Sequence, residues 1–119
     1  MSDWRDIGNT GEPWPRWIGS LKGKSGAYAI RRKPGRLGAQ VVYYVGESHT
    51  NHLRRTLTRH FQDWNGKTAG QTYAREDVQI KIQTTQPSKA VDLQNRWIKQ
   101  LDPTDNSYNR PDDLSDVPF

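Results

Sequence analysis

Tyrosines, arginines and histidines of this chain have the side chains needed to act on a phosphate group. Tyr28 and Tyr44 each lie in a short run whose composition is typical of a β-strand. A predicted helix follows them and carries four basic or titratable side chains: Arg54, Arg55, Arg59 and His60. A guanidinium group offers forked donors that match phosphate oxygens, so this combination indicates phosphodiester chemistry. A solvated helix face explains a surface arginine pair equally well.

Gln94 is a polar residue on a predicted apolar helix face. At 100° per residue it falls between Val91 and Trp97, on the face that we expect to be buried. A buried amide without a partner costs about 1–3 kcal/mol, so Gln94 needs a hydrogen bond or a ligand. Two interpretations stay open: a core glutamine bonded to backbone or water, or a side chain that faces a bound group.

Other catalytic schemes find little support in the residues. The chain has no cysteine, which excludes thiolate metal sites and disulfides, and no Gly-x-Ser-x-Gly or Walker-type phosphate-binding motif. We expect none of His49, His52 and His60 to have a carboxylate partner at ligand spacing. His49 and His52 are close enough in sequence to share a metal, or they are loop and cap residues.

Length and charge set further bounds. The 119 residues suit one domain, and 32% hydrophobic content with five Trp and five Tyr predicts a small, aromatic core. The net charge of +5, concentrated between Lys22 and Arg59, favours polyanions such as nucleic acids. The sequence shows neither a leader segment nor an apolar run of about 20 residues, so we expect a soluble, cytoplasmic protein without a membrane partner.

The hydrophobic pattern predicts an α+β fold, a small three-stranded antiparallel sheet flanked by helices. Alternation indicates strands over residues 25–30, 41–46 and 78–83. Apolar residues three and four apart predict helices over residues 51–66 and 87–101.

The chain ends and the first loop carry further candidates. Residues 1–24 form a Trp-rich arm that docks on the domain or contacts DNA, residues 25–109 the domain, and residues 110–119 a tail. The loop from residue 31 to 40 is either a solvated hairpin tip or a phosphate-binding loop with four cations: Arg31, Arg32, Lys33 and Arg36.

Five short elements follow one another between Ser25 and Asn109: Gly26-Ala27-Tyr28, Tyr44-Val45-Gly46, Arg59-His60-Phe61, the helix from Gln94 to Leu101, and Asn106-Ser107-Tyr108-Asn109. In this order they resemble the motifs of the GIY-YIG endonucleases. The resemblance implies metal-dependent hydrolysis of DNA phosphodiester bonds, with one Mg²⁺ or Mn²⁺ held by a glutamate of the second helix. The position of that glutamate is Gln94 in this chain.

The resemblance also implies roles for other residues. Tyr28 is the expected general base or water-orienting phenol, Tyr44 supports it, and His60 assists with phosphate or proton handling. One arginine of the first helix stabilises the charge on the phosphate; sequence register leaves Arg54, Arg55 and Arg59 as alternatives, because Thr56 occupies one of the two possible positions. The expected nucleic-acid contacts are Arg31, Arg32, Lys33, Arg36, Arg54 and Asn109.

The glutamine at position 94 changes the expected activity. A neutral amide oxygen is a much poorer ligand for Mg²⁺ than a carboxylate, so we expect the metal to bind only with Glu at this position. The chain is then a DNA endonuclease inactivated at Gln94, by natural loss or by a deliberate change that traps uncut DNA. The alternatives are an inert nucleic-acid-binding module on the same scaffold and a protein-interaction domain. A homodimer is possible in each case.

Overall fold

A four-stranded antiparallel sheet in the order β1-β4-β2-β3 forms the centre of the protein. The structure is a computed structural model and describes residues 4–34, 41–61 and 73–106. The strands are β1 (Arg5–Asp6), β2 (Ser25–Arg32), β3 (Val42–Ser48) and β4 (Val78–Thr85). The α+β class is confirmed, whereas the prediction of three strands is wrong. β1 adds a fourth strand along β4, and two residues are too few to show an alternating pattern.

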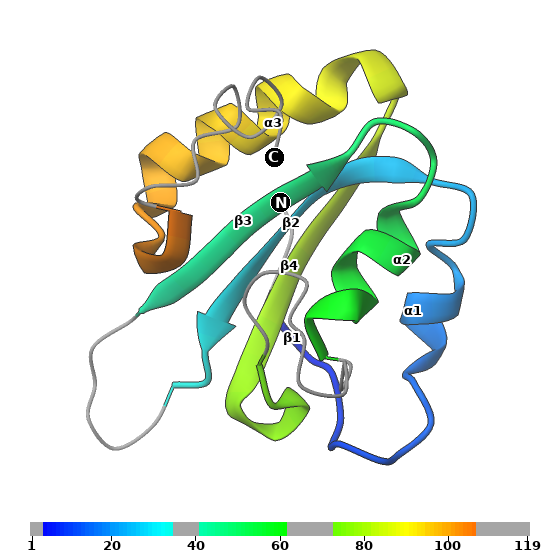
Figure 1. Cartoon of the computed structure of the whole chain (residues 1–119), viewed down its shortest axis with the longest axis vertical. Helices are drawn as coiled ribbons and strands as arrows, with labels where there is room; N and C mark the ends of the chain where they lie inside the picture. The colour runs from blue at the N-terminus through cyan, green and yellow to red at the C-terminus, as the bar shows by residue number, and fades with distance from the viewer. Residues whose placement is uncertain (1–3, 35–40, 62–72, 107–119) are drawn as a thin grey trace, which may run out of the picture.

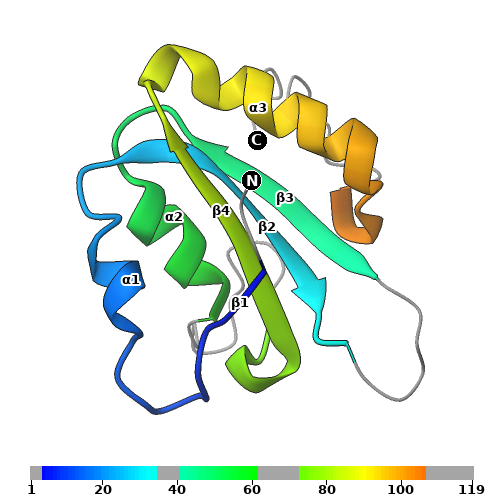
Figure 2. The same cartoon turned by 180° about the vertical axis from the view of Figure 1, so that it is seen from behind.

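Helices cover both faces of this sheet. They are α1 (Arg16–Gly19), α2 (Leu53–Thr58) and α3 (Pro87–Leu101), with 3-10 turns at Arg59–Phe61, Arg75–Asp77 and Thr104–Asn106. α3 crosses one face, and α1 and α2 lie together on the other (Figures 1 and 2). Of the helices within the described ranges, none has the length and apolarity required to traverse a membrane.

The two predicted helices fare differently. α3 begins at Pro87 and ends at Leu101 as predicted, because Asp102 adopts a left-handed backbone (φ 49°) and Pro103 cannot continue the helix. The first predicted helix is shorter than expected, since α2 gives way to a 3-10 turn at Arg59. The remainder of the predicted helix, including Trp64, lies outside the described residues.

Strand alternation divides β2 between two cores. Tyr28 and Ile30 point toward α1 and α2, whereas Ala27 and Ala29 point toward α3. The first core consists of Ile7, Ile18, Leu21, Tyr28, Ile30, Leu53, Leu57, Val78 and Ile80. The second core is smaller and consists of Ala27, Ala29, Val45, Leu93 and Trp97. The alanines of β2 leave room for α3 to pack closely on the sheet.

The buried face of α3 includes Gln94 as predicted, but its apolar residues differ from the prediction. Val91 is 38% exposed, although it was expected in the apolar stripe. Ala90 and Leu93 are buried in its place, beside Trp97. A rotation of 100° separates Val91 from Ala90, which is enough to move it from the edge of the stripe to the surface.

The N-terminal residues contribute to the core. Ile7, Ile18 and Leu21 belong to the first core, and Trp17 packs against it. Trp4 packs against the second core on the opposite face of the sheet. This segment therefore contributes to both layers of the domain.

Candidate functional site

Tyr28 is buried beneath α2 with only 1% of its surface exposed. Its partner across β2 and β3 is Gly46, and the tyrosine ring covers that glycine so closely that a Cβ there would overlap it. The Tyr28 hydroxyl shares a hydrogen bond of 2.8 Å with Nε2 of the buried His60 and lies 3.5 Å from the Thr56 carbonyl oxygen. The phenol is therefore held in place from both the sheet and the helix.

A β-bulge brings further tyrosines to the same face. The pairing register shifts between Ile30 and Arg31, so the neighbours Tyr43 and Tyr44 both pack against the first core. The Tyr44 ring centroid lies 4.8 Å from that of His60 and 6.2 Å from that of Tyr28. Tyr73 stacks on Tyr43 at 5.4 Å. We call this group the tyrosine cluster: Tyr28, Tyr43, Tyr44, His60 and Tyr73.

Burial favours the neutral form of three of these phenols, Tyr28, Tyr44 and Tyr73. Burial raises the pKa of Tyr28 well above its usual value, and the nearby Tyr44 raises it further. Burial also raises the pKa of Tyr44. For Tyr73, burial and a hydrogen bond of 2.6 Å donated to Asp105 Oδ2 raise the pKa. At neutral pH Tyr28 is therefore a phenol that can orient a group, and it does not carry the negative charge of a ready base.

The structure separates the three arginines that the sequence left as alternatives. The charge of Arg59 lowers the pKa of both Tyr28 and Tyr44 against the effect of burial, so Arg59 is the arginine beside the tyrosine cluster. Arg54 and Arg55 instead line a groove between α1 and α2.

The α1–α2 groove has a volume of about 600 Å³. Its polar and aromatic lining comes from Trp14, Arg16, Arg54, Arg55 and Thr58, with Ile18 at its apolar base. Among the described residues that line it, none is acidic. Three guanidinium groups without a carboxylate among them form a site suited to an anion.

Gln94 does not join the tyrosine cluster. It is 8% exposed on α3, the helix that packs on the face opposite Tyr28. Within the described ranges no fully buried side-chain nitrogen or oxygen lacks a hydrogen-bond partner, so the amide of Gln94 is not an orphaned buried group that requires a ligand. A neutral amide across the sheet from Tyr28 does not fit a catalytic Mg²⁺ or Mn²⁺ site beside that tyrosine. The part of the chain that the structure describes also has no group of three or more His, Asp and Glu placed to hold a metal.

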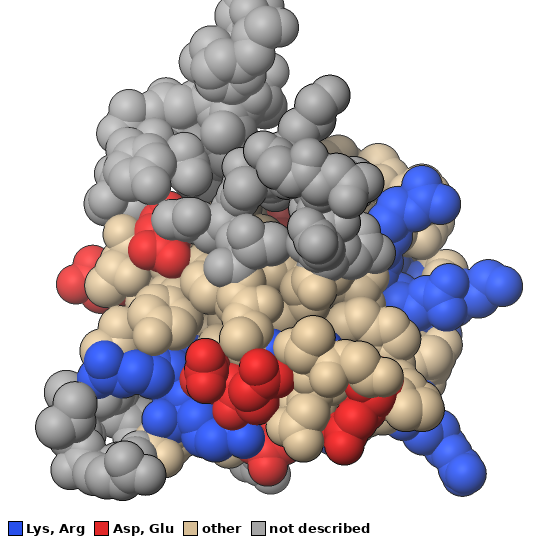
Figure 3. Space-filling view, turned by 60° about the horizontal axis from the view of Figure 1, so that its bottom comes forward, with Lys and Arg blue, Asp and Glu red and all other residues tan. Residues whose placement is uncertain are grey.

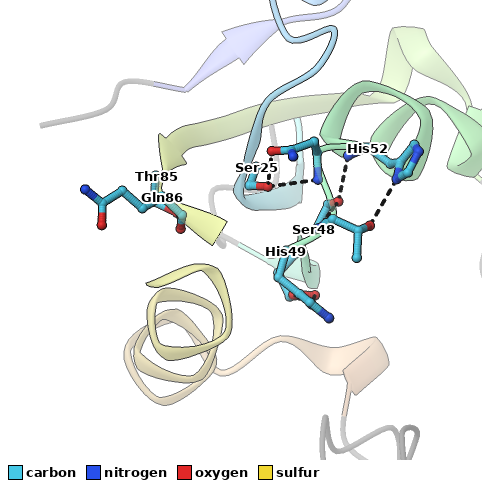
Figure 4. A network of polar contacts seen from close by, with 9 residues as sticks. Ser25, Ser48, His49, His52, Thr85 and Gln86 are labelled. Carbon is cyan, nitrogen blue, oxygen red and sulfur yellow. Dashed lines mark hydrogen bonds and ion pairs between the residues drawn. The ribbon is translucent and has the colours of Figure 1, made fainter. Parts of the chain in front are cut away.

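His49 and His52 lie in the loop between β3 and α2, where each has a local side-chain partner (Figure 4). His49 Nδ1 lies 2.8 Å from Glu47 Oε1, so the expectation that no histidine has a carboxylate partner is wrong for His49. His52 Nδ1 instead pairs with the Thr50 hydroxyl at 3.0 Å. The two rings point in different directions (Figure 4), and these contacts shape the turn into α2. Asn51, with φ 64°, completes that turn: its backbone N–H donates to the Ser25 hydroxyl, and this hydroxyl donates to Asn51 Oδ1.

The cations at the end of β2 make contacts within the protein. Arg31 stacks on Trp4 at 4.5 Å and donates to Gln79 Oε1, and burial lowers its pKa. Lys33 lies 3.7 Å from Asp6. Arg32 is half-buried at the end of the strand, while Arg36 and Asn109 lie outside the described residues. In the view of Figure 3 acidic side chains lie between a group of basic side chains at the lower left and others that project at the right.

Asn106 is a residue that the sequence argument passed over in favour of Asn109. Its Oδ1 accepts from the Val45 N–H at 2.8 Å, and its Nδ2 donates to the Val45 carbonyl at 3.1 Å. The buried side chain thus pairs with the outer edge of β3 as a neighbouring strand would. The run Asn106-Ser107-Tyr108-Asn109 contained this residue, but the sequence gave no reason to prefer the first asparagine.

Comparison with known proteins does not assign this chain to a family. No protein-family model, no curated protein and no solved structure matches it. The case for a function therefore depends on the residues and their geometry.

Proposed function

We propose that this chain is a cytoplasmic DNA-binding protein on a scaffold resembling that of the GIY-YIG endonucleases, and that it holds DNA without cleaving it. The α1–α2 groove is the observation that carries this proposal. Arg16, Arg54 and Arg55 line it, and the lining residues within the described part of the chain include no carboxylate. The same helix, α2, covers the tyrosine cluster, and Arg59 follows at its end.

Electrostatics favour DNA as the partner. Arginine binds phosphate oxygens through paired donors, and each phosphate that a protein neutralises releases counterions from the duplex. The net charge of +5 adds long-range attraction to a polyanion. Binding through the groove arginines is then strongly weakened by salt.

Two features support binding without cleavage. Tyr28 is a buried neutral phenol whose hydroxyl is bonded to His60, so it is poorly placed to take a proton from water. Gln94 offers a neutral amide on the opposite face of the sheet. The chain therefore combines a site for phosphate with a poor set of groups for hydrolysis.

A metal-dependent DNA endonuclease inactivated at Gln94 is the second candidate. The observation that favours it is the gathering of Tyr28, Tyr44 and His60, the residues that the resemblance assigns to catalysis, with the charge of Arg59 beside them. This candidate requires that Gln94→Glu restores a metal site.

Supercoiled plasmid tests both candidates in one experiment. We expect the wild-type protein to retard the plasmid in a gel and to leave it uncut with Mg²⁺ or Mn²⁺, and Gln94→Glu to behave in the same way. Cutting by Gln94→Glu that Tyr28→Phe abolishes would replace the proposal by the second candidate. A wild-type protein that never retards the plasmid would contradict both and favour a protein-interaction domain.

A further inference from the structure

Trp14 is a large aromatic side chain left exposed at the wall of the α1–α2 groove. It is 39% exposed, whereas Trp4 and Trp17 pack against the two cores. It lines the groove together with Arg16, Arg54 and Arg55. An exposed indole beside cations is a suitable surface for stacking a nucleobase.

Contacts with Arg75 and Phe61 fix the orientation of the Trp14 ring. The Arg75 guanidinium carbon lies 4.1 Å from the centroid of the Trp14 ring, and Phe61 meets that ring edge-on at 6.3 Å. Arg75 is only 4% exposed and donates to the carbonyl oxygens of Ile7 at 2.8 Å and Glu12 at 2.7 Å. Because Arg75 is anchored in this way, the indole is held in place before any ligand arrives.

We propose that the groove binds an unpaired nucleotide of DNA, with its base stacked on Trp14 and its phosphates contacting the groove arginines. This inference rests on the proposed DNA binding and adds a preference for single strands. A base inside a duplex is covered on both faces by its neighbours, so only an unpaired base can stack on the indole. The groove volume of about 600 Å³ lies within the range of roughly 300–1,000 Å³ usual for small-ligand sites.

Fluorescence anisotropy with a labelled single-stranded oligonucleotide and its duplex tests the preference. Trp14→Leu should weaken single-strand binding by about 5- to 150-fold, the range expected for loss of one stacked base, and should change duplex binding by less than about twofold. Trp4→Leu serves as the control, because it removes an indole that packs against the second core. Thermal unfolding of both variants establishes that they are folded.

Trp14→Phe gives an independent measurement if the leucine variant unfolds. The single strand should quench the tryptophan fluorescence of the wild-type protein more strongly than that of Trp14→Phe, because the stacked indole is absent from the variant. Equal quenching, or equal losses of single-strand and duplex affinity in Trp14→Leu, would overturn the stacking inference while duplex binding still supports the proposed function. A wild-type protein that binds neither probe would overturn both.

Discussion

Tyr28 and His60 form a buried polar pair inside an otherwise aromatic core. Their hydrogen bond of 2.8 Å joins the middle of the sheet to the turn that ends α2. Both residues are at most 2% exposed, so the bond is shielded from water. The pair thus has a structural role whether or not the protein acts on DNA.

Removal of the Tyr28 hydroxyl should lower stability. Tyr28→Phe keeps the ring over Gly46 and deletes the hydrogen bond to His60, which we expect to cost about 1 kcal/mol of unfolding free energy. Urea unfolding followed by circular dichroism measures the change. Tyr43→Phe is the matched control in the same cluster and should lower the unfolding free energy less. Equal losses of unfolding free energy in the two variants would show that the hydrogen bond between Tyr28 and His60 does not stabilise the fold.

Buried tyrosines also predict how stability depends on pH. Burial raises the pKa of Tyr28 above the value of about 10 that it has in the unfolded chain. Its contribution is fully present below about pH 10 and is lost at higher pH, because only the unfolded chain then releases the proton.

Urea unfolding at several alkaline pH values measures this loss. Tyr28→Phe should reduce the decline in stability by up to about 1.4 kcal/mol per pH unit, which corresponds to one proton. Parallel curves for wild type and Tyr28→Phe above about pH 10 would contradict the raised pKa of Tyr28.

Close packing in β2 and β3 explains why both sequence motifs contain a glycine, Gly26 in the first and Gly46 in the second. A Cβ on Gly46 would overlap the Tyr28 ring, and one on Gly26 would meet the β4 backbone at Gln83 and Thr84. The pattern of glycine and tyrosine in these strands thus follows from close contacts in the sheet. The glycines of the two motifs are therefore explained by packing in the sheet, without reference to catalysis.

Gly46→Ala should disturb the contact between the two strands. The added methyl group must displace the Tyr28 ring, and we expect a loss of about 1–3 kcal/mol, as for overpacking in other cores. Thermal unfolding measures the loss. Gly19→Ala is the control, since a Cβ there meets no atom within 4 Å and its stability should be nearly unchanged; a stable Gly46→Ala would contradict the packing described here.

Asn106 should stabilise the outer edge of β3. Asn106→Ala removes both hydrogen bonds to the Val45 backbone and should cost about 1–3 kcal/mol. Hydrogen exchange at the Val45 amide, measured by NMR, should accelerate, whereas the exposed Asn95→Ala on α3 should leave it unchanged. Unchanged protection at Val45 in Asn106→Ala would show that the edge is held by other contacts.

Sequence periodicity predicted the elements well where they are long. It located β2, β3, β4 and α3, because each repeats its apolar pattern several times. It missed β1, a strand of two residues whose pairing with β4 depends on tertiary structure. It also missed the bulge after Ile30, which carries Tyr43 and Tyr44 to one face against simple alternation.

The candidate site was predicted only in part, because periodicity within an element does not say which face of the sheet that element covers. Tyr28, Tyr44 and His60 do meet, whereas Gln94 lies in the layer on the other side. Trp14 was expected either to pack on the domain or to contact DNA. Its position in the groove depends on Arg75, and nothing in the sequence predicts that this arginine is buried against the Trp14 ring.

The whole molecule is a sheet between two unequal layers. The layer of α1 and α2 holds the larger core, the tyrosine cluster and the arginine-lined groove, while the layer of α3 holds the smaller core and Gln94. The proposed DNA contact therefore belongs to one face of the protein. Charges on α3, such as the exposed Arg96 and Lys99, provide a matched comparison on the other face.

The salt dependence of duplex DNA binding tests this division most directly. The double variant Arg54→Gln, Arg55→Gln should make the negative slope of log affinity against log salt less steep by about 1.8, or roughly 0.9 for each lost phosphate contact. The double variant Arg96→Gln, Lys99→Gln removes the same charge from α3 and should leave the slope nearly unchanged. Equal slopes for the two double variants, or a wild-type protein whose binding does not respond to salt, would contradict the proposed function.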